Sequence, residues 1–179
     1  MKTPTIGLCL CGAAAICCAL PDVSVQDGAL WADGRPFIVR GIAYGGWLCP
    51  DLRGHGEALQ GADLRRMGRL GFNLVKQWGP IGPGLLDACE RHGLYVLNSV
   101  NANSEYPRHR HEAFVAGRLQ EIEQDLLPHD GRSVVLGWNL GSELHDGDWR
   151  ARSPEITHYL QRALLAFRAR SRRPVTYAN

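Results

Sequence analysis

The amino-acid sequence predicts an α/β fold with a parallel sheet. From Phe37 to the end of the chain, short apolar runs alternate with longer amphipathic runs. Strict alternation of this kind is typical of parallel strands joined by crossover helices, because a parallel pair cannot be closed by a short turn. The 179 residues are enough to bury a substantial core.

Ahead of this pattern, residues 23–36 alternate apolar and polar positions around Asp27-Gly28 and Asp33-Gly34. Asp-Gly pairs favour tight two-residue turns, so we predict a short β-hairpin here.

Five strands and four helices are predicted after the hairpin. Helix ends are marked by Gly71 and Gly93, and Ser153 followed by Pro154 is typical of a helix start. The predicted strands are Phe37–Tyr44, Phe72–Trp78, Leu94–Val100, Val134–Leu140 and Pro174–Ala178, and the predicted helices are Ala62–Leu70, Gly84–His92, Glu112–Leu127 and Pro154–Arg170.

Two architectures fit this order, an open doubly wound sheet and a closed (β/α)8 barrel. The open fold often carries a GxGxxG phosphate loop after its first strand, and Gly41, Gly45 and Gly46 do not make that motif. The pattern therefore favours the barrel by a small margin. A complete barrel needs about 250 residues, so a barrel here would be truncated after strand 5.

The N-terminus predicts a secretory signal peptide over residues 1–20, with residues 21–179 as the mature domain. Lys2 precedes an apolar run from Ile6 to Leu20, and 15 residues are too few to span a bilayer as a helix. We therefore expect a secreted or periplasmic protein with no membrane span. A lipoprotein signal ending near Cys17 and Cys18 is the lesser alternative.

Neither a metal nor another cofactor is predicted. Outside the signal segment only Cys49 and Cys89 remain, and their spacing matches no zinc pattern. Cys89 lies in an apolar helical stretch and should be a buried small hydrophobe, and a bridge to Cys49 after export stays open. His109, Arg110 and His111 lack further ligands at suitable spacing, so we expect a solvated loop.

Charge gives no reason to expect a nucleic-acid partner. The formal net charge is +2, and the densest basic stretch runs from Arg168 to Arg173 at the end of a predicted helix. Cations at that end favour the negative pole of the helix dipole, so a solvated helix end is the simpler interpretation.

The segment Val134-Val-Leu-Gly-Trp-Asn-Leu-Gly-Ser-Glu-Leu places Glu143 at the carboxyl end of the fourth strand. Parallel-strand barrels carry their active sites at that rim. Asn139, Gly141 and Glu143 share strand parity and should face one side. Near Trp138 and an apolar strand end, the charged carboxylate would be disfavoured, as a general acid requires. A loop glutamate paired with Arg150 or His145 is an equal alternative.

Five segments in register resemble the barrel domain of clan A glycoside hydrolases, closest to family 2, family 5 and glucanosyltransferase-like relatives. They are DGRPFIVRGIAY, ADLRRMGRLGFNLVKQW, LLDACERHGLYVLNSV, VVLGWNLGSEL and RPVTYAN. The resemblance implies a (β/α)8 TIM barrel in which Glu143 is the general acid/base of a retaining two-carboxylate mechanism. It places the nucleophile at the end of a seventh strand, beyond Asn179, so the 179 residues alone should be inactive.

The resemblance also implies substrate-binding residues. Arg40 matches the family's arginine and is expected in the barrel mouth near the acidic centre. Ser142 stands where the family has an asparagine that holds the sugar 2-hydroxyl, and Lys76 stands where it has an arginine. Asn139, Trp78 and Asn101 are further candidates. Aromatic residues in loops on the same rim are candidate sugar-stacking walls, with loop packing as the alternative for each: Trp47, Trp78, Tyr106 and Trp149.

The predicted function is hydrolysis of O-glycosyl bonds in a β-linked poly- or oligosaccharide, with a carbohydrate as the partner molecule. Two alternatives stay open. The chain can belong to a transglycosylase, or to a non-catalytic carbohydrate-binding barrel, which Ser142 and Lys76 favour. Asn101 and Asn103 follow the third strand and can bind hydroxyls or simply form a turn.

Overall fold

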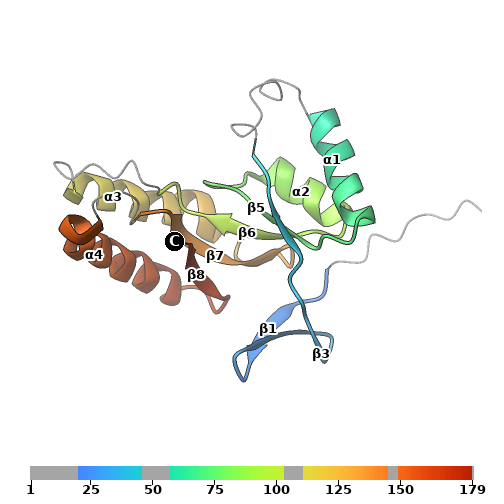
Figure 1. Ribbon diagram of the computed structural model, residues 1–179, viewed down its shortest axis with the longest axis horizontal. Coiled ribbons are helices and arrows are strands. Elements are labelled where there is room, and N and C mark those ends of the chain that lie inside the picture. The colour runs from blue at the N-terminus through green and yellow to red at the C-terminus, as the bar shows by residue number, and fades with distance from the viewer. Residues whose placement is uncertain (1–19, 46–56, 103–110, 145–148, 179) are drawn as a thin grey trace, which may run out of the picture.

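A computed structural model describes residues 20–45, 57–102, 111–144 and 149–178, of which 57–59 and 149–153 are described by their backbone alone. Two sheets are present in these residues (Figure 1). The predicted signal segment lies outside them up to residue 19, as do Trp47, Cys49, Asn103 and Tyr106.

The first sheet is a small antiparallel one, of order β1-β2-β3. It consists of β1 (Val23–Gln26), β2 (Ala29–Ala32) and β3 (Arg35–Pro36). Both connecting turns have positive φ angles at two successive residues, 50° and 76° at Asp27 and Gly28 and 50° and 71° at Asp33 and Gly34. Asp-Gly pairs supply this left-handed geometry at low cost, which explains the sharp reversals.

The second sheet is parallel throughout and has the order β4-β5-β6-β7-β8. Its strands are β4 (Gly41–Ala43), β5 (Leu74–Lys76), β6 (Tyr95–Ser99), β7 (Val135–Ser142) and β8 (Val175–Ala178). A doubly wound sheet reverses its strand order at one point. This sheet follows the chain order without reversal and resembles the start of a (β/α)8 barrel.

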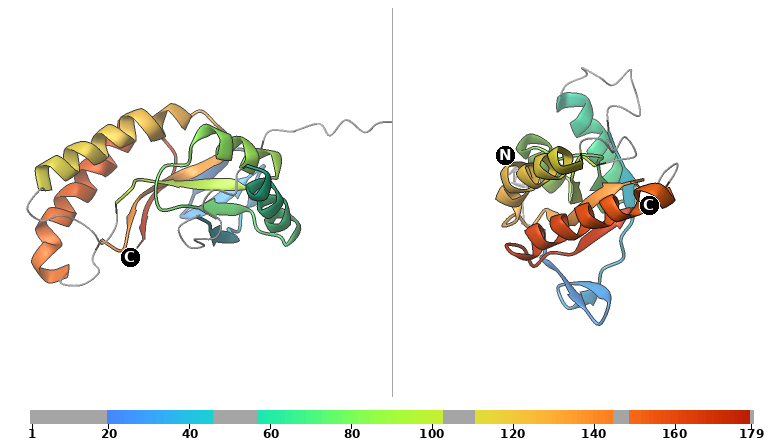
Figure 2. Two further views of the ribbon diagram at one scale, coloured as in Figure 1. Left: turned by 90° about the horizontal axis from the view of Figure 1, so that it is seen from above. Right: turned by 90° about the vertical axis from the view of Figure 1, so that its left-hand side faces the viewer.

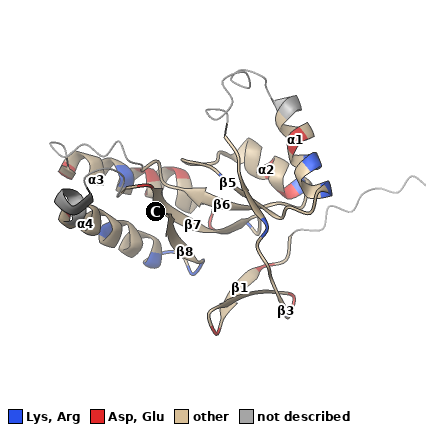
Figure 3. Cartoon of the chain, in the orientation of Figure 1, with Lys and Arg blue, Asp and Glu red and all other residues tan. Residues whose placement is uncertain are grey.

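Helices connect these strands. They are α1 (Glu57–Arg69), α2 (Pro83–Arg91), α3 (His111–Glu121) and α4 (Trp149–Arg168), and α3 continues into a π turn, Ile122–Leu126, and a 3₁₀ turn, Leu127–His129. α1 packs on α2, and α3 packs on α4 (Figure 2). On α1, α2 and α3, acidic and basic residues both occur (Figure 3). None of the helices in the described part of the chain is long and apolar enough to cross a membrane.

The main core lies between the parallel sheet and its helices. Trp138 of β7 is fully buried there, and its indole stacks on Phe167 of α4 at 5.2 Å between ring centroids. Cys89 is also fully buried in this core, and burial raises the pKa of its thiol to about 12. The prediction that Cys89 is a buried small hydrophobe is confirmed.

The other face of the sheet carries a smaller apolar cluster of Leu74, Tyr95 and Leu136. Phe37, which follows β3, packs edge-on against Tyr95 at 5.0 Å between centroids. The Tyr95 hydroxyl donates to the Pro21 carbonyl at 2.6 Å. The N-terminal hairpin segment therefore covers this face near the amino ends of the strands.

The strands and helices fall close to where the sequence predicted them, and the largest differences are at four elements. The first helix begins at Glu57 rather than Ala62. The helix predicted over Glu112–Leu127 leaves α-helical geometry after Glu121, where a π turn and a 3₁₀ turn follow. The first strand is Gly41–Ala43 rather than Phe37–Tyr44, because the Asn73 amide group bonds the Ile38 carbonyl and the Arg40 amide in place of a strand ladder. The last helix begins at Trp149, so Pro154 lies inside it and Ser153 is not its N-cap.

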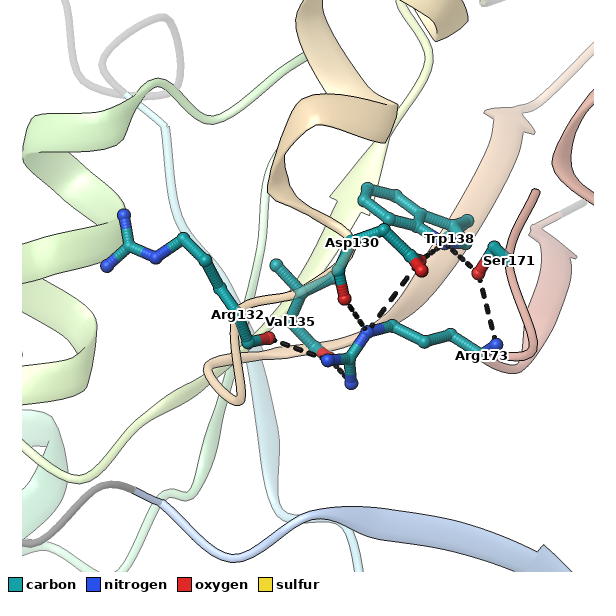
Figure 4. Close-up of polar contacts among 6 residues, drawn as sticks. All are labelled: Asp130, Arg132, Val135, Trp138, Ser171 and Arg173. Carbon is teal, nitrogen blue, oxygen red and sulfur yellow. Dashed lines mark hydrogen bonds and ion pairs between the residues drawn. The ribbon is translucent and has the colours of Figure 1, made fainter.

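The prediction of a solvated basic helix end is confirmed for the exposed Arg168, Arg170 and Arg172 and is wrong for Arg173. Arg173 lies in the connection from α4 to β8. Its half-buried side chain reaches the loop before β7 and donates to three backbone carbonyls there (Figure 4). The partners are Asp130 at 2.8 Å, Arg132 at 2.8 Å and Val135 at 2.5 Å, all at or just before the start of β7. Sequence spacing cannot reveal these partners because they lie about 40 residues away.

Candidate active site

Polar side chains gather at the carboxyl ends of β5, β6 and β7. Lys76 closes β5, and its Nζ donates to the Ser142 hydroxyl of β7 at 2.8 Å. The Asn139 amide nitrogen donates to Ser99 Oγ of β6 at 3.2 Å and to Ser142 Oγ at 3.4 Å. These four residues, named here the rim network, link three neighbouring strands on the face that would line a barrel.

Ser142 is the centre of the rim network and is 3% exposed. Its oxygen accepts from Lys76 and from Asn139, so its lone pairs are occupied and its hydroxyl hydrogen remains as a donor. Among the described residues, Asn139 Oδ1 is buried and has no hydrogen-bond partner. One donor and one acceptor of the network are therefore left without a partner among the described residues, and both belong to buried side chains.

The chain leaves β7 through an irregular backbone. Gly141 has a φ of 148° and Glu143 has a φ of 57°, in the left-handed region that is uncommon for a glutamate. The Ser142 amide donates to the Ala102 carbonyl at 2.9 Å and the Glu143 amide donates to the Ala178 carbonyl at 3.0 Å. Neighbouring strand ends therefore hold this turn in place, as expected for an unusual conformation kept at a functional site.

This turn overturns the predicted common face of Asn139, Gly141 and Glu143. The pairing of β7 with β8 shifts between Asn139 and Ser142, so simple alternation ends there. Asn139 and Ser142 come together instead, as their hydrogen bond shows.

The predicted apolar surroundings of Glu143 are also wrong. Its side chain is exposed, whereas Trp138 is buried among the helices on the opposite face. The Trp138 indole N–H donates to Ser171 and Asp130 at 2.9 and 3.2 Å (Figure 4). Glu143 nevertheless lies at the carboxyl rim, because it follows β7 directly.

Lys76 is the cation of the site. Burial lowers the pKa of its ammonium, and the negative charge of Glu143 opposes this by raising the pKa. Its Nζ also lies 4.6 Å from the centroid of the half-buried Trp78 ring, within the range of a cation–π contact. Lys76 therefore connects the rim network to Glu143 electrostatically and to an aromatic surface beside them.

Gly141→Ala should destabilise the fold by about 1–3 kcal/mol, because an L side chain is strained at positive φ. A Cβ there would also lie 2.8 Å from the Ala102 carbonyl oxygen. Gly117→Ala is the control, since nothing lies within 4 Å of its added Cβ and alanine favours a helix. Urea denaturation checks this, and equal stability of the two variants would contradict the strain argument.

Trp78 and Asn101, two further predicted substrate-binding residues, also follow the carboxyl ends of parallel strands, β5 and β6. Asn101 is exposed just after β6, and its backbone is held by Glu121, which accepts from its amide at 2.5 Å, and by Arg118, which donates to its carbonyl. Trp78 lies at the rim with Lys76. The placement of the Trp149 side chain lies outside what the structure describes.

Arg40 does not lie near the acidic centre. It precedes β4, and its Nε donates to the Gly71 carbonyl at 2.6 Å before β5 begins. Arg40 is therefore at the amino ends of the parallel strands, whereas Glu143 follows the carboxyl end of β7. The prediction placed Arg40 in the mouth by its match to the family's arginine, and the structure shows that it precedes the first parallel strand, which begins at Gly41.

Ser99 was missed by the sequence-based prediction. It closes β6 and is fully buried, and its hydroxyl accepts from Asn139 at 3.2 Å. A small polar residue at the carboxyl end of a buried strand was the available signal. The preceding Asn98 is structural, because its Oδ1 accepts from the Ile81 amide at 2.7 Å.

The expectation of a solvated loop at His111 is wrong, while His109 and Arg110 lie outside the described residues. His111 begins α3, and its Nε2 lies 2.8 Å from Nδ1 of His158 on α4. His158 is 47 residues further along the chain, so local spacing could not indicate it.

The fold resembles that of TIM-barrel glycosidases. A β-glucuronidase of Bifidobacterium dentium complexed with coumarin-3-O-glucuronide superposes with a TM-score of 0.68 at 21% identity, over 88% of this chain and 26% of that one. An endo-1,4-β-mannanase of Eisenia fetida gives a TM-score of 0.59 at 16% identity, over 88% and 61%. At these identities the likeness shows the fold.

Curated relatives found by sequence are β-galactosidases. That of Klebsiella pneumoniae is 25% identical over 148 residues, covering 78% of this chain and 14% of the relative. That of Photobacterium profundum is 26% identical over 135 residues, covering 70% and 13%. The chain thus spans about one seventh of the length of these relatives. No family model matches it.

Proposed function

We propose that this chain is the N-terminal part of a glycoside hydrolase barrel that cleaves O-glycosyl bonds of a β-linked oligo- or polysaccharide. The observation that carries the proposal is the position of Glu143, which directly follows β7 beside Lys76 and the buried Ser142. The β-galactosidase relatives support the same class of reaction.

In the proposed reaction, a second carboxylate attacks the anomeric carbon and forms the glycosyl-enzyme, while Glu143 protonates the glycosidic oxygen of the departing group. Glu143 then removes a proton from the water that attacks the glycosyl-enzyme. Its exposure at the rim leaves the carboxyl group accessible to a substrate. The nucleophile is a second carboxylate, which we assign to sequence beyond Asn179.

The rim network would bind the sugar. The Ser142 hydroxyl hydrogen and the Asn139 Oδ1 acceptor are suited to one sugar hydroxyl next to the reacting carbon. Lys76 holds Ser142 and carries the positive charge where an arginine was expected. Hydrogen bonds to the sugar 2-hydroxyl strengthen in the transition state, so this contact would act on rate as well as on affinity.

The test uses the longest protein that the gene encodes and a panel of nitrophenyl β-galactoside, β-glucuronide and β-mannoside. We expect turnover of at least one of these glycosides with net retention of configuration at the anomeric carbon. ¹H NMR of the first sugar product released measures that configuration. Inverted product would rule out the two-step mechanism. Saturable binding of oligosaccharides without turnover of any glycoside would favour the non-catalytic barrel, and a disaccharide product made in place of free sugar would favour a transglycosylase.

Export is part of the proposal. An N-terminal signal over residues 1–20 would deliver the enzyme to polysaccharides outside the cytoplasm. Mass spectrometry of the exported protein should then find a mature N-terminus near Pro21.

A further inference from the structure

Two histidines and a glutamate, residue types that commonly ligate metal ions, lie together between α3 and α4, apart from the rim network. His111 Nε2 lies 2.8 Å from His158 Nδ1, and a carboxylate oxygen of Glu112 lies 3.7 Å from His111 Nε2. All three candidate ligand atoms fall within 4.8 Å of one another. We propose that His111, His158 and Glu112 bind a divalent first-row transition metal ion.

The chemistry of the donors selects the class of metal. Imidazole nitrogens suit zinc, nickel and copper, whereas calcium and magnesium prefer sites made of oxygen alone. Glu112 adds one anionic oxygen, and its side chain is 80% exposed, so it can move toward an ion at little cost. The remaining coordination positions would be filled by water.

The 2.8 Å contact between the two imidazoles is a hydrogen bond, in which one ring N–H points at the other nitrogen. To bind one ion, that nitrogen must release its proton and the rings must rotate until both lone pairs face the ion. The contact therefore shows that the two nitrogens lie close enough to share an ion, and it leaves zinc, nickel and copper equally suitable.

The two helices hold the histidines in this relation. Phe114 lies one turn after His111 and packs edge-on against Tyr159, the residue after His158, at 5.4 Å between centroids. The Tyr159 hydroxyl in turn donates to the Leu140 carbonyl of β7 at 2.5 Å. The spacing of α3 and α4 is therefore set by packing beneath the cluster, and a bound ion would cross-link helices that already have the required separation.

The site is tested by calorimetric titration of the metal-free protein from Pro21 onward with Ni²⁺ and Zn²⁺, because four cysteines of the predicted signal segment would bind the same ions. We expect one ion per chain, with affinity weakened at least about tenfold in both His111→Gln and His158→Gln. Glu112→Gln should weaken it less, because one exposed oxygen is lost. His92→Gln is the matched control and should bind as the parent does, since His92 lies at the end of α2, outside this cluster. Unchanged binding in both cluster variants, or no binding by the parent, would overturn the proposal.

A second measurement needs no variant and so does not depend on the folding of His158→Gln. The electron paramagnetic resonance spectrum of the Cu²⁺-loaded parent chain should show coupling to two imidazole nitrogens. Coupling to one nitrogen or to none would overturn the shared site. Glycosidase activity plays no part in either readout, so the result is independent of the proposed function.

Discussion

Replacement of Glu143 by glutamine is expected to lower hydrolysis of unactivated glycosides by about 10²–10⁴-fold in the longest protein that the gene encodes. The amide keeps the size of the side chain and cannot donate or accept the catalytic proton. Steady-state kinetics on a natural disaccharide and on an aryl glycoside measure the effect. Because Glu143 is exposed, the variant should fold as the parent does, which circular dichroism checks.

Two further results would separate a general acid/base from a residue that merely binds sugar. A dinitrophenyl glycoside needs little protonation of its leaving group, so its glycosylation step should be affected far less. Azide should restore turnover, since it attacks the glycosyl-enzyme without base assistance. Glu123→Gln, on an exposed side chain after α3, is the control and should retain parent activity. Equal activity of Glu143→Gln and the parent would remove Glu143 from the mechanism.

The order of strands and helices could be predicted because each strand is marked by its own apolar run. Apolar runs such as Leu94–Val100 and Val134–Leu140 are buried on both faces, and the helices between them show one apolar side. The position of Glu143 followed from the end of one such run. Local pattern is therefore enough to predict these features, although the sheet itself is built from pairings between distant strands.

Side-chain direction at the strand ends could not be predicted in the same way. Alternation fails after Asn139 because Gly141 takes a φ of 148°, which turns Ser142 toward the rim network. Arg40 was misplaced for a different reason, because a match to the family's arginine stood in for its position in the strand. It precedes β4 and bonds the Gly71 carbonyl at the amino ends of the strands.

Contacts between segments far apart in the chain could not be predicted from the sequence either. His158 meets His111 only because Tyr159 anchors α4 on β7 and packs against Phe114 of α3. Lys76 meets Ser142 because β5 and β7 flank β6 in the same parallel sheet. A pairing of this kind depends on the register of two helices or strands, which a single sequence does not reveal.

The largest effect on stability is expected for Arg173→Met, at about 3 kcal/mol. Methionine keeps much of the apolar stem, but the three carbonyls that Arg173 holds would lose their charged donor. A buried acceptor left without a partner costs about 1–3 kcal/mol. The Arg132 carbonyl keeps the Val135 amide as a donor at 3.1 Å, and partial access of water should reduce the sum further. Arg173 also lies 3.8 Å from the Asp130 carboxylate, which accepts from the Trp138 indole (Figure 4).

Arg172→Met is the matched control for this prediction, because Arg172 is the exposed neighbour and its loss should change stability by less than about 0.5 kcal/mol. Arg173→Lys should fall between the two, since an ammonium keeps the charge but lacks the planar fork that reaches three carbonyls. Urea denaturation of all three variants measures the difference. Arg173 fixes the loop that begins β7, and the same strand ends at Ser142 and Glu143. Arg173→Met should therefore also disturb the rim network, and equal stability of Arg173→Met and Arg172→Met would show that these hydrogen bonds hold neither the loop nor the strand.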